Sequence, residues 1–118
     1  MEFDWVAWKE AEHLRNITYK ARIASRLLKA RREARRLAGM LKEADAGLSS
    51  IILFGSTARG DPSSDRFDID IAVEHSSCFA LLEAATVAEG FTVDLIQLEY
   101  APPRLRENIE REGIVLYG

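Results

Sequence analysis

Apolar residues recur every three or four positions from residue 3 to residue 45, which is the spacing of an amphipathic helix. The segment has no proline and one glycine, Gly39, and most of its residues lose little rotamer freedom in a helix. A first apolar stripe loses its register at Arg31 and Arg32, and a second stripe follows. The first comprises Ala7, Leu14, Ile17, Ala21, Ala24 and Leu28, and the second Ala34, Leu37, Ala38 and Leu41. The pattern predicts either one long helix with a shifted stripe or two helices in line.

Shorter elements follow Gly47, which ends the helical region. Four apolar or alternating segments predict strands, and two segments with helical spacing predict helices. The strands are expected at 50–54, 68–74, 91–98 and 114–117, and the helices at 78–88 and from 102 or 103 to 108 or 112. This order predicts an α+β fold, close to α/β, with a small mixed sheet and flanking helices. We divide the chain into an N-terminal helical extension, 1–46, and a domain, 47–118, within a single unit overall.

Length and composition restrict the class of protein further. The 118 residues suit one domain, and the single cysteine, Cys78, excludes an internal disulfide and suits a reducing compartment. The first residues lack a basic stretch followed by an apolar core, and no apolar run approaches the roughly 20 residues that span a bilayer. We therefore expect a cytoplasmic protein that does not enter a membrane.

The net charge of −3 hides a basic segment, because residues 20–36 hold eight of the sixteen lysines and arginines and one acid, Glu33. A basic helix of this kind binds nucleic acid or an acidic partner, or is a solvated face. We favour the solvated or partner-facing interpretation over nucleic acid, because no aromatic or glycine-rich element interleaves the charges. The apolar stripe either contacts another chain or covers the domain's own sheet. Trp5 and Trp8, one turn apart, are expected to anchor packing.

Two carboxylates share one face of the segment 68–74. Side chains alternate along a strand, so Asp68 and Asp70 point one way while Ile69, Ile71 and Val73 point to the core. Like charges this close repel each other. A hard divalent cation such as Mg²⁺ relieves that repulsion, since it prefers carboxylate oxygens. A pair of surface aspartates at the start of a strand is the alternative.

A short motif upstream suits an anion. Gly55 and Ser56 follow the apolar run 50–54, and if a helical turn begins there, Ser56 is its N-cap and free backbone N–H groups face a ligand. Gly55 lets a phosphate approach the backbone without a Cβ in the way. Arg59 and Arg66 either reach the same phosphates or are solvated loop residues.

A third carboxylate, Asp94, lies inside the predicted strand 91–98. A lone charge buried in a strand costs several kcal/mol unless it is paired or bound to a metal. Beside Asp68 and Asp70 it would complete a cluster of three. Two-metal phosphoryl chemistry uses such clusters to align the attacking and leaving oxygens.

Taken in order, these motifs resemble the minimal nucleotidyltransferases of the DNA polymerase β superfamily. The resemblance covers residues 48–118 and rests on FGSTARGD, DIDIAVE, VDLIQLE and EREGIVLYG. It implies a nucleotidyltransferase fold, ATP as substrate, two Mg²⁺ ions and transfer of AMP to a hydroxyl. By the same resemblance Gly55 and Ser56, with Arg59, hold the triphosphate. Asp68, Asp70 and Asp94 are then the catalytic and metal-binding residues.

Two positions depart from the family pattern. The segment Thr57–Phe67 is one residue longer than is usual between Gly-Ser and the first aspartate, and Phe67 stands where serine is common. The extra residue costs little thermodynamically, but it bears on how a nucleotide sits. Asp65 is a rival first carboxylate, yet it falls outside the alternating strand, so we prefer Asp68.

Small members of this family resemble the antitoxins of toxin–antitoxin pairs, whose partner is a helical HEPN-type toxin carrying the acceptor tyrosine. They also resemble catalytic halves of two-subunit nucleotidyltransferases, which work with a substrate-binding subunit. We expect a protein adenylyltransferase with a HEPN-type partner. The alternatives are a non-catalytic partner-binding antitoxin and a small-molecule nucleotidyltransferase subunit. The N-terminal helix is the candidate surface for a partner or for a homodimer.

Overall fold

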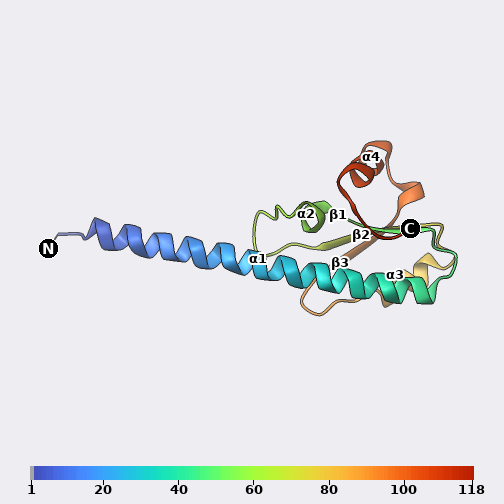
Figure 1. Cartoon of the computed structure of the whole chain (residues 1–118), viewed down its shortest axis with the longest axis horizontal. Helices are drawn as coiled ribbons and strands as arrows, with labels where there is room; N and C mark the ends of the chain where they lie inside the picture. Colours follow the sequence, from blue (N-terminus) through green and yellow to red (C-terminus); the bar gives the residue numbers. More distant parts are fainter. Residues whose placement is uncertain (1) are drawn as a thin grey trace.

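The computed structural model describes residues 2–118, and every expected helix and strand is present in the expected order, with two short helices added, Gly55–Arg59 and Leu98–Tyr100 (Figure 1). The helices are α1 (Trp5–Ala44), α2 (Gly55–Arg59), α3 (Phe79–Ala85) and α4 (Pro103–Glu112), with a short 3-10 helix, η1 (Leu98–Tyr100). The strands are β1 (Ser50–Phe54), β2 (Ile69–Glu74), β3 (Val93–Gln97) and β4 (Ile114–Tyr117). No helix among residues 2–118 is both long enough and apolar enough to cross a membrane.

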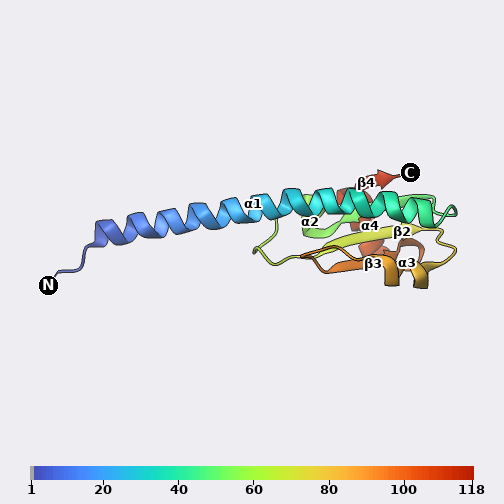
Figure 2. The same cartoon turned by 90° about the horizontal axis from the view of Figure 1, so that it is seen from below.

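The sheet is mixed and has the strand order β3-β2-β1-β4. Strand β1 pairs antiparallel with both β2 and β4, whereas β2 and β3 are parallel. Helix α1 runs along one face of this sheet, as the two views agree (Figures 1 and 2). Side chains of β1 alternate between two cores, so that Ile51 and Leu53 pack with α1 while Ile52 packs with Ile109 of α4. The predicted α+β architecture with a small mixed sheet and a preceding long helix is confirmed.

Helix α1 is a single rod of 40 residues, which decides between the two arrangements that its pattern allowed. Its second apolar stripe covers the sheet, with Ala34, Leu37 and Leu41 fully buried. Its first stripe is exposed, and Leu14 and Leu28 are 63% and 59% accessible to solvent. The loss of register at Arg31 and Arg32 is therefore the point at which the apolar side of the helix changes from facing outward to facing the sheet.

The basic segment of α1 has a role that neither sequence interpretation included. Arg26 donates to the carbonyl oxygen of Gly90 at 3.0 Å, and Arg36 donates to that of Val87 at 3.0 Å. Arg31 donates to two further carbonyl oxygens, in α2. Guanidinium groups present several donors in a rigid fork and so suit clusters of backbone carbonyls. Part of the basic segment thus fastens the helix to loops of the domain.

The end of α1 is tied to the loop after β2 by Asp45, which is 2% exposed. Its carboxylate accepts hydrogen bonds from Ser76 Oγ at 2.8 Å, from Ser77 Oγ at 2.7 Å, and from the backbone N–H groups of Ser77 and Gly47. Donation by the Ser77 hydroxyl leads a set of hydrogen bonds that holds the pKa of Asp45 far below its usual value. This contact fixes the turn between α1 and β1.

The expectation for the two tryptophans is wrong. Trp5 and Trp8 are 64% and 45% exposed and contact each other edge to face, with ring centroids 6.1 Å apart. Phe3 lies against Trp5 at 4.6 Å. The reason is geometric, because this end of α1 projects beyond the sheet (Figure 2) and has no core to pack on.

Candidate functional site

The three predicted aspartates meet at one end of the paired strands β2 and β3. Asp70 and Asp94 are direct partners in the parallel register, and Asp68 immediately precedes β2. Adjacent strands lie about 4.8 Å apart, so carboxylates on paired residues repel each other. Ile69, on the opposite side of the strand, is fully buried, as the alternation predicted.

Asp94 is not the costly buried charge that its place inside a strand predicted. Asp94 is exposed, whereas its neighbour Leu95, on the other face of β3, is buried at 5% exposure. The exposed charge needs no compensation, so its position inside a strand is no evidence of a metal. What links Asp94 to the site is its register opposite Asp70.

Gly55 lies against the carboxylate of Asp70, and this contact joins the two motifs. Its φ of 72° lies in the left-handed region that favours glycine, and a Cβ at this position would collide with Asp70 Oδ2. Phe54, the residue before it, is the pairing partner of Asp70. Pairing of β1 with β2 therefore places the Gly-Ser turn over the carboxylate.

The expectation that Ser56 caps a helix is wrong. Helix α2 begins at Gly55, its N-cap is Phe54, and no side chain makes the cap hydrogen bond. Ser56 lies one residue inside the helix, where its carbonyl oxygen accepts from the N–H groups of Gly60 and Asp61. Ser56 remains beside Gly55, and it does not act through a side-chain cap.

Thr57 is a positioning residue that sequence reasoning missed. It is fully buried, and its Oγ1 donates to the carbonyl oxygen of Asp68 at 2.9 Å. Arg31 of α1 donates through Nε to the carbonyl oxygen of Thr57 at 2.9 Å and through a terminal nitrogen to that of Ala58 at 3.0 Å. These contacts hold α2 between α1 and the first carboxylate. In the sequence, the only signal for this role was that a threonine directly follows the Gly55-Ser56 motif.

Asp70 is the electrostatic centre of the cluster. Its pKa is raised to about 6, mainly by burial and then by the charges of Asp94 and Asp68, while Arg59 acts in the opposite direction. Because both neighbouring aspartates act on this one carboxyl, the three groups share an electrostatic environment. A titratable group shifted by burial and by specific charged neighbours is a candidate for function.

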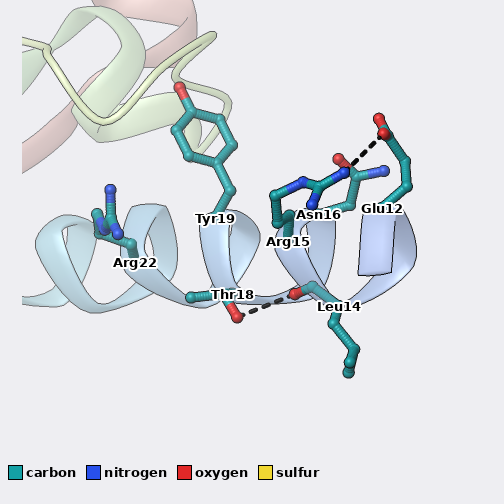
Figure 3. Close-up of a pocket in the computed structure, with 7 residues that line it drawn as sticks. All are labelled: Glu12, Leu14, Arg15, Asn16, Thr18, Tyr19 and Arg22. Carbon is teal, nitrogen blue, oxygen red and sulfur yellow. Dashed lines mark hydrogen bonds and ion pairs between the residues drawn. The ribbon is translucent and has the colours of Figure 1, made fainter. Parts of the chain in front are cut away.

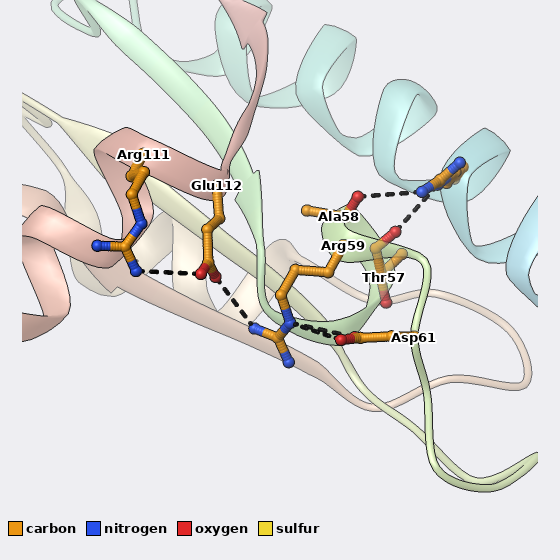
Figure 4. Close-up of polar contacts among 7 residues, drawn as sticks. Thr57, Ala58, Arg59, Asp61, Arg111 and Glu112 are labelled. Atoms are coloured by element: carbon orange, nitrogen blue, oxygen red, sulfur yellow. Dashed lines mark hydrogen bonds and ion pairs between the residues drawn. The ribbon is translucent and has the colours of Figure 1, made fainter.

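Arg59 lies on the Gly55 side of the site. Its guanidinium pairs with Asp61 at 3.1 Å and with Glu112 of α4 at 3.5 Å, and Glu112 also pairs with Arg111 (Figure 4). A cavity of about 170 Å³ lies here between β1, α2 and α4. Its lining comprises Phe54, Gly55, Arg59, Leu105, Asn108, Ile109 and Glu112. Arg59 therefore lines a cavity next to the turn predicted to hold phosphate.

A second cavity, of about 260 Å³, lies on the Asp68 side, and Arg66 lines it. Phe67, the departure from the family pattern, packs here against Phe91, and the Arg26 guanidinium lies 4.4 Å from the centre of the Phe91 ring. The rival carboxylate Asp65 points elsewhere and approaches Arg22 of α1 at 3.7 Å. The structure thus places Asp68, and not Asp65, at the carboxylate cluster.

The chemistry of this donor set fits a hard divalent cation. Mg²⁺ is usually held by one or two carboxylates, with water and substrate phosphates completing its shell. Asp70 and its partner Asp94 provide such a pair, and their repulsion would be relieved by a cation. Across residues 2–118, however, no three His, Cys, Asp or Glu side chains are already gathered closely enough to hold an ion. A cation here would need ligands from outside the chain or a shift of Asp68.

The sequence from residue 37 to residue 118 matches the family described as polymerase beta, nucleotidyltransferase. The chain belongs to this family. Its match begins inside α1, ten residues before the domain boundary that we placed at 47, and that boundary remains a prediction. Among curated proteins, none matches the chain.

Three solved structures show what the chain is similar to. A variant of the toxin–antitoxin pair MntA–HpeT matches with a TM-score of 0.59 and 25% identity over 72% of each chain. The complex of a tri-AMPylated HEPN toxin with MNT antitoxin from Shewanella oneidensis matches at 0.58 and 25%, over 75% of this chain and 72% of the other. A nucleotidyltransferase-type protein from Sulfolobus solfataricus, at 0.57 and 15%, covers 80% and 85% and supports the fold alone. The chain is thus a minimal nucleotidyltransferase similar to antitoxins of HEPN toxin pairs.

Proposed function

We propose that this chain transfers AMP from ATP to a hydroxyl group on a HEPN-type partner, with Mg²⁺ bound at its carboxylate cluster. The observation that carries the proposal is the contact of Gly55 with Asp70, whose strand partner is Asp94. It places a turn free of a Cβ directly beside paired carboxylates. A metal–polyphosphate complex needs both features at one place.

Each residue of the site has a specific task in this proposal. The backbone at Gly55 and Ser56 and the guanidinium of Arg59 hold the triphosphate, whose negative charge would replace Asp61 and Glu112 as partners of Arg59. Asp68, Asp70 and Asp94 would hold Mg²⁺. The bound cation would offset charge on the phosphates and lower the barrier for the attacking and leaving oxygens.

The acceptor side of the reaction falls to Asp94. An incoming hydroxyl oxygen forms a bond to the α-phosphorus, the bond to the bridging oxygen of the β-phosphate breaks, and pyrophosphate leaves. The hydroxyl proton passes to a base, and we assign this role to Asp94, which lies opposite Asp70 in the register of β2 and β3. Asp94 is exposed on an edge strand, so a hydroxyl on another protein has access to it.

The choice of partner is supported by the solved structures. One of them is described as a tri-AMPylated HEPN toxin in complex with its MNT antitoxin, and another as a toxin–antitoxin with AMP-PNP, at 27% identity over 71% of this chain and 73% of the other. Those descriptions concern the other proteins. Their similarity to this chain makes a HEPN-type protein the acceptor that we propose.

Calorimetric titration of ATP with Mg²⁺ tests the nucleotide site. We expect the wild-type protein to bind and the Asp68→Ala/Asp70→Ala variant not to bind, with binding also lost when a chelator removes the cation. Asp65→Ala is the matched control, because Asp65 is a nearby carboxylate paired with Arg22. Equal binding by the double variant and the wild type would contradict the assigned site.

Transfer is tested with ATP labelled at its α-phosphate, in the presence of a purified HEPN-type protein from the same host. We expect label on the partner with the wild-type chain and none with Asp94→Asn, which keeps the size of the side chain but does not take up a proton. Label on this chain alone, or release of labelled AMP without transfer, would contradict a partner protein as acceptor.

A second candidate is a partner-binding antitoxin without catalysis. It is favoured by one observation, the absence within residues 2–118 of three carboxylates already gathered to hold an ion. Under this proposal the chain neutralises its partner by contact, and Asp94→Asn protects cells against the toxin as well as the wild type does. Loss of protection with retained partner binding would favour the enzyme.

A further inference from the structure

Helix α1 has two apolar sides that face in different directions. The residues that pack on the sheet, such as Leu37 and Leu41, are fully buried, whereas Leu14 is 63% exposed and Ile17 is 50% exposed. At 3.6 residues per turn, the mean directions of the two stripes lie roughly 150° apart around the helix axis. The exposed stripe consists of Ala7, Leu14, Ile17, Ala21, Ala24 and Leu28 and is called the outward stripe below.

The flank of α1 beside this stripe is hollowed but has only one wall. A hollow of about 540 Å³ is lined entirely by residues of α1 between Glu12 and Arg22. Figure 3 shows Tyr19 and Leu14 extending from opposite sides of the helix. Within residues 2–118, no second element closes this hollow, so any covering surface has to come from another molecule.

The outward stripe has the spacing of a helix–helix contact. From Leu14 to Leu28 its members follow one another at intervals of three, four, three and four, which is the heptad pattern of paired helices. The middle of the stripe carries small residues, Ala21 and Ala24, so a second helix can approach closely there. The larger Leu14 and Leu28 flank this middle on either side.

Charges at the two ends of the outward stripe have opposite signs. Glu10 lies four residues before Leu14, while Arg32 and Arg35 lie four and seven residues after Leu28, so all three share the outward side. All three are exposed, and within residues 2–118 none of them forms an ion pair. The stripe is therefore apolar in its middle, acidic at one end and basic at the other.

We propose that the outward stripe pairs with the same stripe of a second copy of this chain, with the two helices antiparallel. The charges decide both the partner and the direction. Antiparallel pairing about a two-fold axis near Ala21 brings Glu10 of each copy toward Arg32 and Arg35 of the other, twice by symmetry. Parallel pairing would place acid against acid and base against base, which disfavours it.

This pairing leaves the nucleotidyltransferase site open. The second stripe, which packs on the sheet, and the outward stripe lie on different sides of α1. Pairing through the outward stripe therefore does not displace the sheet from the second stripe. Antiparallel helices also place the two globular parts at opposite ends of the pair. Each copy thus keeps its Asp70 and Asp94 accessible, and the inference does not depend on the proposed function.

Sedimentation velocity on the full chain, over a range of concentrations, tests the pairing. We expect a dimer for the wild type and a monomer for Leu14→Glu/Ile17→Glu, with the helical circular dichroism of the domain retained because both side chains are exposed. Leu81→Glu is the matched control. Leu81 is an apolar residue of α3 that is 71% exposed and is not part of the outward stripe, so this variant should remain a dimer.

A charge exchange tests the direction. Glu10→Arg alone, or Arg32→Glu/Arg35→Glu alone, places like charges together at both ends and should weaken dimerisation by roughly tenfold or more. The triple variant restores opposite charges across an antiparallel pair and should restore the wild-type dissociation constant. A parallel pair already has like charges opposite each other in the wild type. It should therefore not be weakened by either exchange alone, and the triple variant would have nothing to restore.

Three results would overturn the proposal. A wild-type monomer at every concentration would show that the outward stripe does not pair with a second copy. A dimer that survives Leu14→Glu/Ile17→Glu would place the interface elsewhere on the chain. A triple charge variant that dimerises no better than Glu10→Arg would exclude the antiparallel arrangement.

Discussion

Gly55 and Asp70 are in direct contact, although the rest of α2 and a loop separate them in the chain. The backbone of Gly55 occupies the space that a Cβ would need, directly beside Asp70 Oδ2, and its φ of 72° disfavours any other residue. The contact makes the conformation of the turn and the position of the carboxylate depend on each other. A change at either residue should therefore affect both stability and nucleotide binding.

Gly55→Ala should disrupt the site. The new Cβ meets the carboxylate and strains a left-handed backbone, so we expect the free energy of unfolding to fall by about 1–3 kcal/mol. Binding of ATP with Mg²⁺ should also be lost, because Asp70 is displaced. Urea denaturation and calorimetry measure the two effects.

Gly39→Ala is the control for this substitution. Gly39 lies within α1, and a Cβ there would meet nothing within 4 Å. Alanine should stabilise the helix by about 0.5–1 kcal/mol and leave nucleotide binding unchanged. Equal effects at the two glycines would show that backbone entropy, and not the contact with Asp70, decides the outcome.

Asp70→Asn should stabilise the metal-free protein at neutral pH. Because the folded pKa of about 6 lies above that of an unfolded aspartate, the folded state binds this proton more tightly. The stabilising contribution is present below about pH 4 and is lost as the pH rises through 6. Asparagine avoids that loss, worth roughly 1 kcal/mol after allowing for solvent screening of a partly exposed group.

Thermal denaturation with and without Mg²⁺ measures this effect. In chelator, the wild type should lose stability from pH 4 to pH 7 relative to Asp70→Asn. Addition of Mg²⁺ at pH 7 should raise the midpoint of the wild type and leave that of the variant unchanged, since a bound cation favours the ionised carboxylate. A midpoint of the wild type that does not respond to Mg²⁺, even with ATP present, would contradict the metal site.

Local patterns predicted the strands well and their arrangement only in part. The run of apolar residues at 50–54 became β1 with the expected bounds, and alternation correctly placed Ile69 in the core and Asp70 outside it. Asp94 was misjudged because the exposure of a strand residue depends on what packs over its face of the sheet, and Leu95 on the other face of β3 is buried while Asp94 is exposed. That packing is set by contacts between distant segments, which one segment's pattern does not contain.

The same limit applies to α1. Periodicity revealed two stripes and the break between them, but it does not say on which side of a helix a domain lies. The contacts of Arg31 with Thr57 and Ala58 span 26 and 27 residues and appear only when the chain is folded. A charge run is therefore ambiguous in sequence, since the same arginines serve as solvated groups or as donors to a neighbouring loop.

Arg31→Ala should weaken nucleotide binding without touching the nucleotide. Arg31 holds the carbonyl oxygens of Thr57 and Ala58, and through Thr57 it supports the backbone of Asp68. Loss of these bonds should lower stability by about 1–3 kcal/mol. Arg31→Lys should rescue it only in part, because an ammonium group cannot reproduce the fork of donors.

Binding of ATP with Mg²⁺ separates a positioning role from a purely structural one. At a temperature where Arg31→Ala is fully folded, its affinity should still be below that of the wild type. Lys29→Ala, which removes an exposed basic residue of the same helix, should bind normally. Normal binding by folded Arg31→Ala would mean that α2 keeps its position without this contact.

Asp45→Asn should reduce stability at neutral pH and flatten its loss in acid. The folded pKa of Asp45 lies below its usual value, so its contribution is present above the unfolded value of about 4 and is lost as the pH falls below it. An amide oxygen cannot accept all the hydrogen bonds that Ser76, Ser77 and Gly47 donate to the carboxylate. Thermal midpoints between pH 3 and pH 7 measure both effects.

Asp61→Asn, at an exposed side chain, is the control and should follow the wild type. The dependence of stability on pH that Asp45 contributes is opposite in sign to that of Asp70, so the two effects can be told apart. If the thermal midpoints of the wild type and Asp45→Asn change with pH in the same way, the tie between α1 and the loop after β2 does not govern acid stability.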